Sequence, residues 1–407
     1  MRALFLKLHR WIGLGIVSVI VVAALTGAGL AFFYEIDAWA APQLFAVSRP
    51  GDGLRIDPLA VRDALLREHP GAKIETVPLR VRQGGSLRMR YTDPAKANGT
   101  VLPYKWNEVF YDPATGKVLG ERNYGQITDG LINLMPFVYR VHYGFAGNLD
   151  VEHIVAFAAL MWLVGSLLGL ILTFPRAFRD AAAERGGPET WLRRWGGAWL
   201  INWKAPASRV NADFHRASGL WLLPFVFIFA TSAVALSLPD AYRPFALAMG
   251  ARRTAGELPD APRSAAPMSF KDARARGRLL LVDVAGKEGF SCCSDEVSLS
   301  FWAANNTFTY VARSSLDIDA QGGGTTVIFD ASSGALRGVV EPTQGSKMDT
   351  FSTWTRTLHT GRAWGWSYRA AVFLIALVIV ANNVTGVVMW LHRRKFRASA
   401  IARGGRA

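Results

Sequence analysis

Four long apolar runs divide the chain. They cover residues 12–33, 154–174, 220–238 and 370–390. A helix that crosses a bilayer needs about 20 predominantly apolar residues, and each run is about that long. The pattern therefore predicts a membrane α-helical protein with four spans. Two long intervals of mixed polarity separate span one from span two and span three from span four.

The first run also raises the alternative of a cleaved signal peptide, because Ala38-Trp39-Ala40 resembles a small-residue cleavage site. The apolar core of a signal peptide is about 7–15 residues long, and this run is longer. Cleavage would also remove His9, which has a repeat partner later in the chain. We therefore favour a membrane span.

Basic residues gather beside the ends of the apolar runs. The formal net charge is +15, but no basic stretch is interleaved with aromatics in a way that would bind nucleic acid. Basic residues close to helix ends mark the cytoplasmic side, so both termini and the middle loop are expected inside. The residues concerned are Arg2, Lys7, Arg10, Arg176, Arg179, Arg185, Arg193, Arg194, Lys204, Arg209, Arg393, Arg394, Lys395 and Arg397.

This topology predicts eight segments, with an α+β domain in each external interval. Helical spacing at 58–69 and alternation at 74–77 and 87–91 support the first of these domains. The segments are span one with a cytoplasmic N-terminus (1–34), external domain one (35–150), span two (151–175), a cytoplasmic loop (176–214), span three (215–239), external domain two (240–368), span four (369–392) and a basic cytoplasmic tail (393–407).

The two halves of the chain repeat one design. A hairpin-like phrase with an Asp/Gly turn at 109–120 returns at 327–338, an offset of 218. His142 and Gly169 return as His359 and Gly386 at an offset of 217, and His9-Arg10 returns as His215-Arg216 at 206. Nearly constant offsets indicate an internal duplication. Both halves start inside, so the repeats are parallel and related by an axis along the membrane normal.

Six of the seven histidines lie at membrane boundaries. His9, His215 and His392 are expected inside, and His142, His153 and His359 outside. Two imidazoles facing each other across an apolar bundle suit the two faces of a planar macrocycle such as haem. They do not suit structural zinc, which usually takes four ligands. Nearby arginines are candidates to neutralise haem propionates, namely Arg10, Arg216, Arg140 and Arg356.

The alternative is that these histidines simply place a polar edge at the interface. One such histidine would favour that interpretation, but two repeat-matched pairs, one per leaflet, favour a cofactor. His153 and His392 lack a histidine at the repeat-related position. His153 starts span two and competes with His142 for the place opposite His359, and this choice stays open.

Three other patterns bear on packing. Trp191, Trp195, Trp199 and Trp203 recur every four residues, which predicts one helical stripe on the inner leaflet, weakened at Gly196-Gly197. Gly165 and Gly169 predict close helix approach, while Asn382 and Asn383 predict hydrogen bonds between helices. The adjacent pair Cys292-Cys293 would form a strained ring, with a redox or a merely structural role.

The chain resembles the PepSY-associated transmembrane family over nearly its whole length. The resemblance rests on residues 8–14 (Leu-His-Arg-Trp-x-Gly-Leu), on the 214–221 motif around His215, on the histidines before spans two and four, and on both external hairpins. Bacterial inner-membrane members include siderophore-iron reductases with b-type haems. The resemblance therefore implies reduction of ferric siderophores on the periplasmic side through two haems.

By the same resemblance, His9 and His215 would ligate an inner haem iron, and His142 and His359 an outer one. The chain has no Gly-x-Gly-x-x-Gly nucleotide motif and no acid–base or nucleophile constellation, so no catalytic side chain is expected. The electron donor would be a quinol, another protein or a small reductant. The alternatives are a non-catalytic protein whose external domains bind peptide or protease partners, and a transport accessory for the iron complex.

Overall fold

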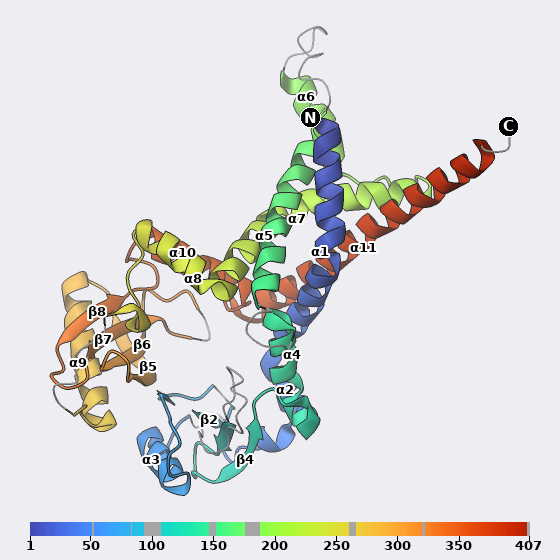
Figure 1. Cartoon of the computed structure of the whole chain (residues 1–407). Helices are drawn as coiled ribbons and strands as arrows, with labels where there is room; N and C mark the ends of the chain where they lie inside the picture. Colours follow the sequence, from blue (N-terminus) through green and yellow to red (C-terminus); the bar gives the residue numbers. More distant parts are fainter. Residues whose placement is uncertain are drawn as a thin grey trace. The chain divides into compact units, whose positions relative to one another are not determined.

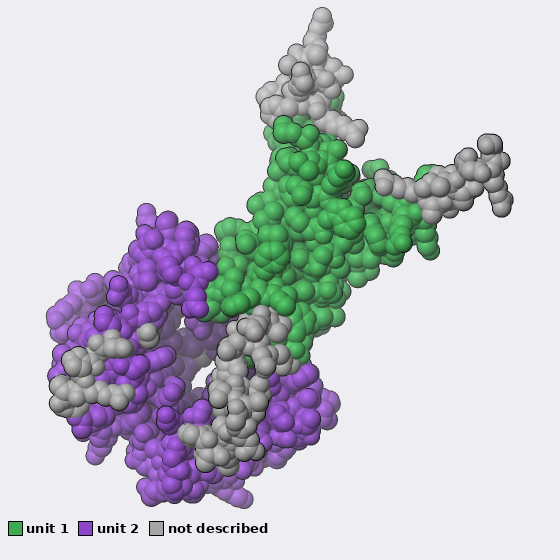
Figure 2. All heavy atoms as spheres, in the orientation of Figure 1, with its two compact units in different colours: residues 1–31, 141–239, 370–407 green, residues 32–140, 240–369 purple. Residues whose placement is uncertain are grey.

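The chain folds into two compact units, coloured separately in Figure 2. The computed structural model describes residues 1–50, 53–82, 84–92, 107–145, 152–175, 188–259, 266–319 and 322–404. The helical unit comprises residues 1–31, 141–239 and 370–407, and the sheet unit comprises residues 32–140 and 240–369. Arg176, Arg179 and Arg185 of the predicted basic loop lie outside the described residues.

The helical unit contains four helices that are long and apolar enough to cross a membrane, as the sequence predicts. They are α1 (Arg2–Leu30), α5 (Glu152–Thr173), α7 (Ala207–Ser237) and α11 (Gly365–Gly404). Figure 1 shows α5 beside both α1 and α7. Helical hydrogen bonds satisfy most of the backbone within each segment, as a bilayer requires, except at Pro224 inside α7, which has no N–H to donate.

Apolar residues from all four helices form the core of the helical unit. Ile16 and Ile20 of α1 meet Ala158 of α5, while Leu222 and Val226 of α7 and Ile379 of α11 complete the cluster. Shorter helices of this unit are α6 (Pro188–Gly196) and the 3₁₀ turn η6 (Gly197–Trp199). Helix α4 (Leu134–Gly144) crosses the boundary between the two units, and its residues 141–144 belong to the helical unit. Helices α1 and α7 begin ten or more residues before their apolar runs, and α11 continues to Gly404, well beyond the end of its run. Polar and basic residues thus continue each helix past its apolar stretch.

The sheet unit holds two antiparallel sheets. The smaller one has the order β2-β3-β4 and the larger one β1-β5-β6-β7-β8. Helix α9 packs across β5, β6 and β7 (Figure 1). The strands are β1 (Thr76–Pro78), β2 (Leu87–Tyr91), β3 (Asn107–Tyr111), β4 (Val118–Asn123), β5 (Cys292–Trp302), β6 (Thr307–Ser314), β7 (Thr325–Asp330) and β8 (Leu336–Val340). The helices are α2 (Phe33–Ala40), α3 (Pro58–Glu68), α8 (Pro239–Ala248), α9 (Phe270–Glu288) and α10 (Lys347–His359).

The two intervals between spans share this unit, whereas the sequence predicts one separate domain in each. Strand β1 of the first interval adds to the edge of the second interval's sheet, with Val77 opposite Leu299. Leu65 and Leu87 belong to the same buried cluster as Leu281 and Tyr310. Pairing covers an edge strand of the larger sheet. Sequence periodicity shows which residues are buried but not which distant strand covers them.

Both predicted hairpins are confirmed, as β3–β4 and β7–β8. In each turn an aspartate accepts backbone hydrogen bonds, Asp112 from Ala114 at 2.8 Å and Asp330 from Ser333 at 2.8 Å. Bonds from Ser48, above all, lower the pKa of Asp112 to about 2. Bonds from Ser333 likewise lower the pKa of Asp330. The two turns thus keep the same carboxylate role in both halves of the chain.

Cys292 and Cys293 form a disulfide with each other at the start of β5. The backbone of Cys293 has a positive φ of 72°. Both side chains pack against the buried cluster of the sheet unit. The sequence leaves open a redox or a structural role for this pair, and the observed packing is compatible with both.

Candidate histidine site

The structure brings His9 and His215 together within the helical unit. His9 lies on α1 and His215 on α7, and their ring centroids are 6.2 Å apart at an interplanar angle of 68°. Neither ring lies at the middle of a span, because each histidine precedes the apolar part of its helix. Two residues 206 positions apart in the sequence thus form one pair.

Each ring of this pair makes the same hydrogen bond to the backbone of a neighbouring helix. Nδ1 of His9 lies 2.8 Å from the carbonyl oxygen of Gly165 on α5, and Nδ1 of His215 lies 2.9 Å from that of Asn382 on α11. A carbonyl oxygen only accepts, so Nδ1–H is the donor in both bonds. This tautomer leaves Nε2 of each ring with a lone pair, as a metal ligand requires.

Each ring also lies against a glycine. A Cβ atom added to Gly169 would come within 3.1 Å of Cε1 of His9, and one added to Gly386 within 3.0 Å of Cε1 of His215. A side chain at either position would press on the ring. A side chain at Gly165 would likewise push α1 away from α5, because its Cβ would lie 3.2 Å from Ile12. The two glycines of α5 therefore allow both α1 and its histidine to pack closely against α5.

The spacing of the His9 and His215 rings would suit two imidazoles that ligate one haem iron. Two imidazole–metal bonds of about 2 Å, plus the distance from each ring nitrogen to its centroid, add up to about 6 Å, close to the observed 6.2 Å. Among the described residues, no group of three or more His, Cys, Asp or Glu side chains could hold a metal ion. A metal held by this pair therefore needs further donors, which a macrocycle supplies itself.

His142 makes the same type of contact at the other end of α1. This residue lies on α4, and its Nδ1 is 3.0 Å from both the carbonyl oxygen of Ala23 and the Oγ1 atom of Thr26. A Cβ on Gly27 would come within 3.1 Å of Cε1 of the ring. One helix thus carries a histidine near its start and seats another near its end.

His359 ends α10, and its side chain is half-buried. It belongs to the sheet unit, while His142 belongs to the helical unit. In α7, Ser232 stands 206 residues after Thr26, and both hydroxyls donate to the carbonyls three and four residues earlier in their own helices. The matched hydroxyls thus lie near the C-terminal ends of α1 and α7.

The two histidines that the sequence places at membrane boundaries without a repeat partner are both exposed. His153 lies at the start of α5 and His392 near the end of α11. Neither makes a hydrogen bond to another of the described residues. The backbone carbonyl and glycine that accompany His9, His215 and His142 thus do not accompany His153, which the sequence proposes as a rival ligand.

Two of the four arginines proposed for propionates already bind protein groups. Arg216 pairs with Asp213 at 3.0 Å and donates to the carbonyl of Ala198 at 3.1 Å. Arg140 donates to the carbonyl of Gly125 at 3.2 Å. Arg10 forms no ion pair with any described residue. Arg216 therefore links the middle loop to α7, and Arg10 is the more available cation beside the His9–His215 pair.

Three of the four tryptophans of the middle loop form a cluster instead of the single helical stripe that the spacing of all four predicts. Helix α6 ends at Gly196, so Trp203 falls outside it and is exposed. Trp195 stacks on Trp191 at 5.7 Å, and Trp199 lies 5.4 Å from Trp195 and 5.0 Å from Trp221 of α7. The glycine pair ends the helix, and Trp199 beyond it contacts Trp221 of α7.

The sequence pattern does not point to some of the residues around the histidines. Thr26 and Gly27 contact His142, and Thr385 lies 3.3 Å from Nδ1 of His215. The signal for the carbonyl partners was nevertheless present, because Gly165 and Asn382 differ by the same 217 positions as Gly169 and Gly386. Backbone carbonyls carry no residue-type signature, so only the repeat offset could have pointed to them.

Four apolar helices and histidines seated on neighbouring helices, together with two antiparallel sheets, define a multi-pass membrane protein with an added β-sheet unit. The chain belongs to the family of the PepSY-associated TM region, whose sequence profile matches residues 6–393. No curated protein matches the chain in sequence. The family assignment thus rests on the profile and agrees with the arrangement of spans and sheets.

Proposed function

We propose that this protein is a transmembrane di-haem electron-transfer protein of a bacterial inner membrane, which reduces ferric iron in siderophore complexes. The observation that carries the proposal is the His9–His215 pair, with matched Nδ1–carbonyl bonds and rings 6.2 Å apart. A metal-ligating histidine characteristically donates its other ring N–H to such a carbonyl. The siderophore substrate itself is carried over from the family resemblance.

His9 and His215 would hold the inner haem, and His142 and His359 the outer one. Bound haem supplies one-electron redox chemistry at its iron. The residues of the chain hold the imidazoles in one tautomer, through the carbonyls of Gly165, Asn382 and Ala23. His359 is assigned from the sequence repeat alone. No acid or base is required, since electron transfer needs positioning and a tuned environment.

The proposal includes two parallel repeats with both termini inside and the sheet unit in the periplasm. The matched seats of His9 and His215, and the matched hydroxyls of Thr26 and Ser232, support the duplication. A hydrocarbon core of about 30 Å is too wide for a single cofactor to bridge. The inner pair and the outer pair are therefore both necessary, one near each face of the membrane.

The test is the colour and haem content of the purified protein. We expect reduced-minus-oxidised bands of six-coordinate b-type haem, with about two haems per chain. His9→Ala and His215→Ala should each remove about half of the haem, and His142→Ala and His359→Ala the other half. His392→Ala is the matched control, because this histidine is exposed and should leave haem content unchanged.

Two outcomes would contradict the proposal at different levels. A colourless protein from haem-replete cells would exclude the electron-transfer function and favour the partner-binding or transport alternatives. A red protein whose haem content survives all four substitutions would instead exclude the ligand assignment. Loss of the outer haem in His153→Ala but not in His142→Ala would show that the ligand opposite His359 is His153 of α5 and not His142 of α4.

A further inference from the structure

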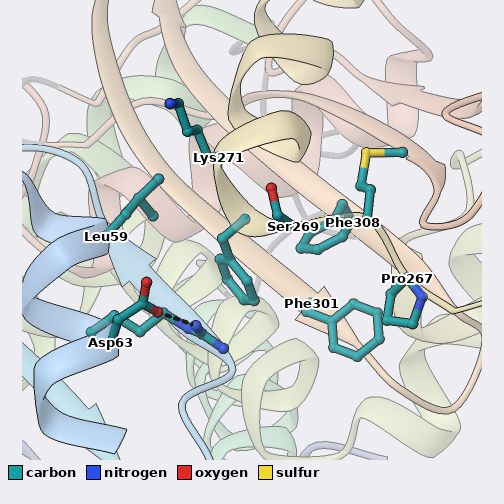
Figure 3. Close-up of a pocket in the computed structure, with 10 residues that line it drawn as sticks. Leu59, Asp63, Pro267, Ser269, Lys271, Phe301 and Phe308 are labelled. Carbon is teal, nitrogen blue, oxygen red and sulfur yellow. Dashed lines mark hydrogen bonds and ion pairs between the residues drawn. The ribbon is translucent and has the colours of Figure 1, made fainter. Parts of the chain in front are cut away.

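The sheet unit has an open pocket of about 370 Å³ that the proposed electron path does not use. Its walls come from α3, from the first residues of α9 and the segment before it, and from β5 and β6. Figure 3 shows Leu59 and Asp63 on the α3 side, facing Phe301 and Pro267 across the pocket. The two intervals of the chain thus both contribute residues to this pocket.

Aromatic rings form the apolar wall of the pocket. Phe308 is buried, and its ring lies 5.1 Å from that of Phe270 at 90° and 5.0 Å from that of Phe301. Phe270 and Phe301 are only half-buried, so part of each ring lines the pocket. Half-exposed rings offer edges and faces to a further aromatic ring, which favours offset or edge-to-face contact.

Two cations and one carboxylate complete the lining. The guanidinium of Arg62 lies 3.8 Å above the ring of Phe270 and donates to Asp63 at 2.8 Å. Lys271, in the first turn of α9, is exposed and forms no ion pair with any described residue. Asp272 is held by Ser269 at the start of the helix. The lining therefore carries a net charge of about +1 beside an aromatic wall.

We propose that this pocket binds an aryl anion, with its flat ring against Phe270 and Phe301 and its carboxylate or phenolate toward Lys271 and Arg62. An apolar cavity of about 150 Å³ accommodates benzene, so a pocket of 370 Å³ admits one substituted ring rather than a whole multi-armed iron complex. The inference rests on the proposed function only for the identity of the natural ligand. Under that function, the ligand is the aryl arm of a catecholate or phenolate siderophore.

Binding of 2,3-dihydroxybenzoate to the purified full-length protein, measured by titration calorimetry, tests the pocket. We expect this aryl anion to bind at least tenfold more tightly than cyclohexanecarboxylate, which has the charge but no aromatic ring. Lys271→Glu should weaken binding at least tenfold. Lys287→Glu, at the far end of the same helix, is the matched control and should leave affinity unchanged. Asp63→Asn should strengthen binding several-fold, because it removes the anion of the lining.

Equal affinity for the two carboxylates, or equal loss in the two lysine variants, would overturn the proposal. Both lysines are exposed, so misfolding does not confuse this result. Competition by the ferric complex of 2,3-dihydroxybenzoate would support the siderophore arm, and binding of the free acid alone would exclude it. Haem content, measured on the same samples, tests the proposed function separately. A colourless protein that binds the acid would support the pocket proposal and exclude the reductase function.

Discussion

The carbonyl and glycine against each ring, here called its seat, are matched for His9 and His215, but the side chains around the two seats differ. Each ring donates to a carbonyl and lies on a glycine four residues further along the same helix. Around His9 the neighbouring contact is apolar, with Ile12 against Gly165. Around His215 it is polar, because Asn382 donates to both the carbonyl of His215 and the hydroxyl of Ser218, each at 2.8 Å.

This difference distinguishes the contacts that position each imidazole ring from the contacts that hold the two helices together. The carbonyl and the glycine appear in both halves, so they define the position of the ring. The amide of Asn382 appears in one half only, where it joins α7 to α11. Hydrogen bonds between membrane helices contribute on average about 0.6 kcal/mol each. The two seats should therefore respond alike to changes at the glycines and differently to changes in polar neighbours.

The largest effect is expected from the glycines. Gly386→Val and Gly169→Val place a branched side chain where a single Cβ already reaches within 3.0 Å and 3.1 Å of the imidazole. If His9 and His215 hold a haem as proposed, each substitution should displace one of its ligands and remove about half of the haem, as measured by the pyridine haemochrome spectrum. Gly29→Val is the control on α1, since a Cβ there meets nothing within 4 Å. Normal haem content in both variants would show that the rings do not depend on these seats.

The sequence predicts the spans and the pairing of the inner histidines, because both follow from apolar run length and repeat offset. The hairpins follow from the Asp/Gly turns, and the structure confirms them. The sequence does not predict that β1 pairs with β5, since a three-residue strand carries little periodicity of its own. The Trp cluster is missed for a related reason. Four-residue spacing identifies one face of a helix, whereas Trp221 reaches the cluster from another helix.

An intermediate effect is expected from Asn382→Ala. The substitution keeps the backbone carbonyl that His215 uses but removes two side-chain hydrogen bonds to α7. Two such bonds contribute about 1 kcal/mol in a bilayer, so haem should be retained while the temperature of haem release in detergent falls by a few degrees. Asn383→Ala is the control, because this amide donates only to Ile379 of its own helix. An equal fall in both variants would mean that Asn382 does not specifically join the helices.

The smallest effect is expected from Thr385→Val, which refines the comparison to a single hydrogen bond. The hydroxyl of Thr385 donates at 2.7 Å to the carbonyl of Asn382, which also accepts from His215. A carbonyl that serves one donor instead of two accepts more strongly from the imidazole, which becomes a better electron donor to a bound metal.

The midpoint potential of the haem proposed at His9 and His215 should therefore fall in Thr385→Val. An effect of roughly 0.5 kcal/mol corresponds to about 20 mV for one electron, which a potentiometric titration resolves. Thr26→Val is the matched control, because Thr26 donates at 3.1 Å to the carbonyl of Ala23, which His142 uses. It should shift the outer haem and leave the inner one unchanged. A rise in the inner potential in Thr385→Val would show that the hydroxyl acts on the imidazole directly, across the 3.3 Å to Nδ1, rather than through the shared carbonyl.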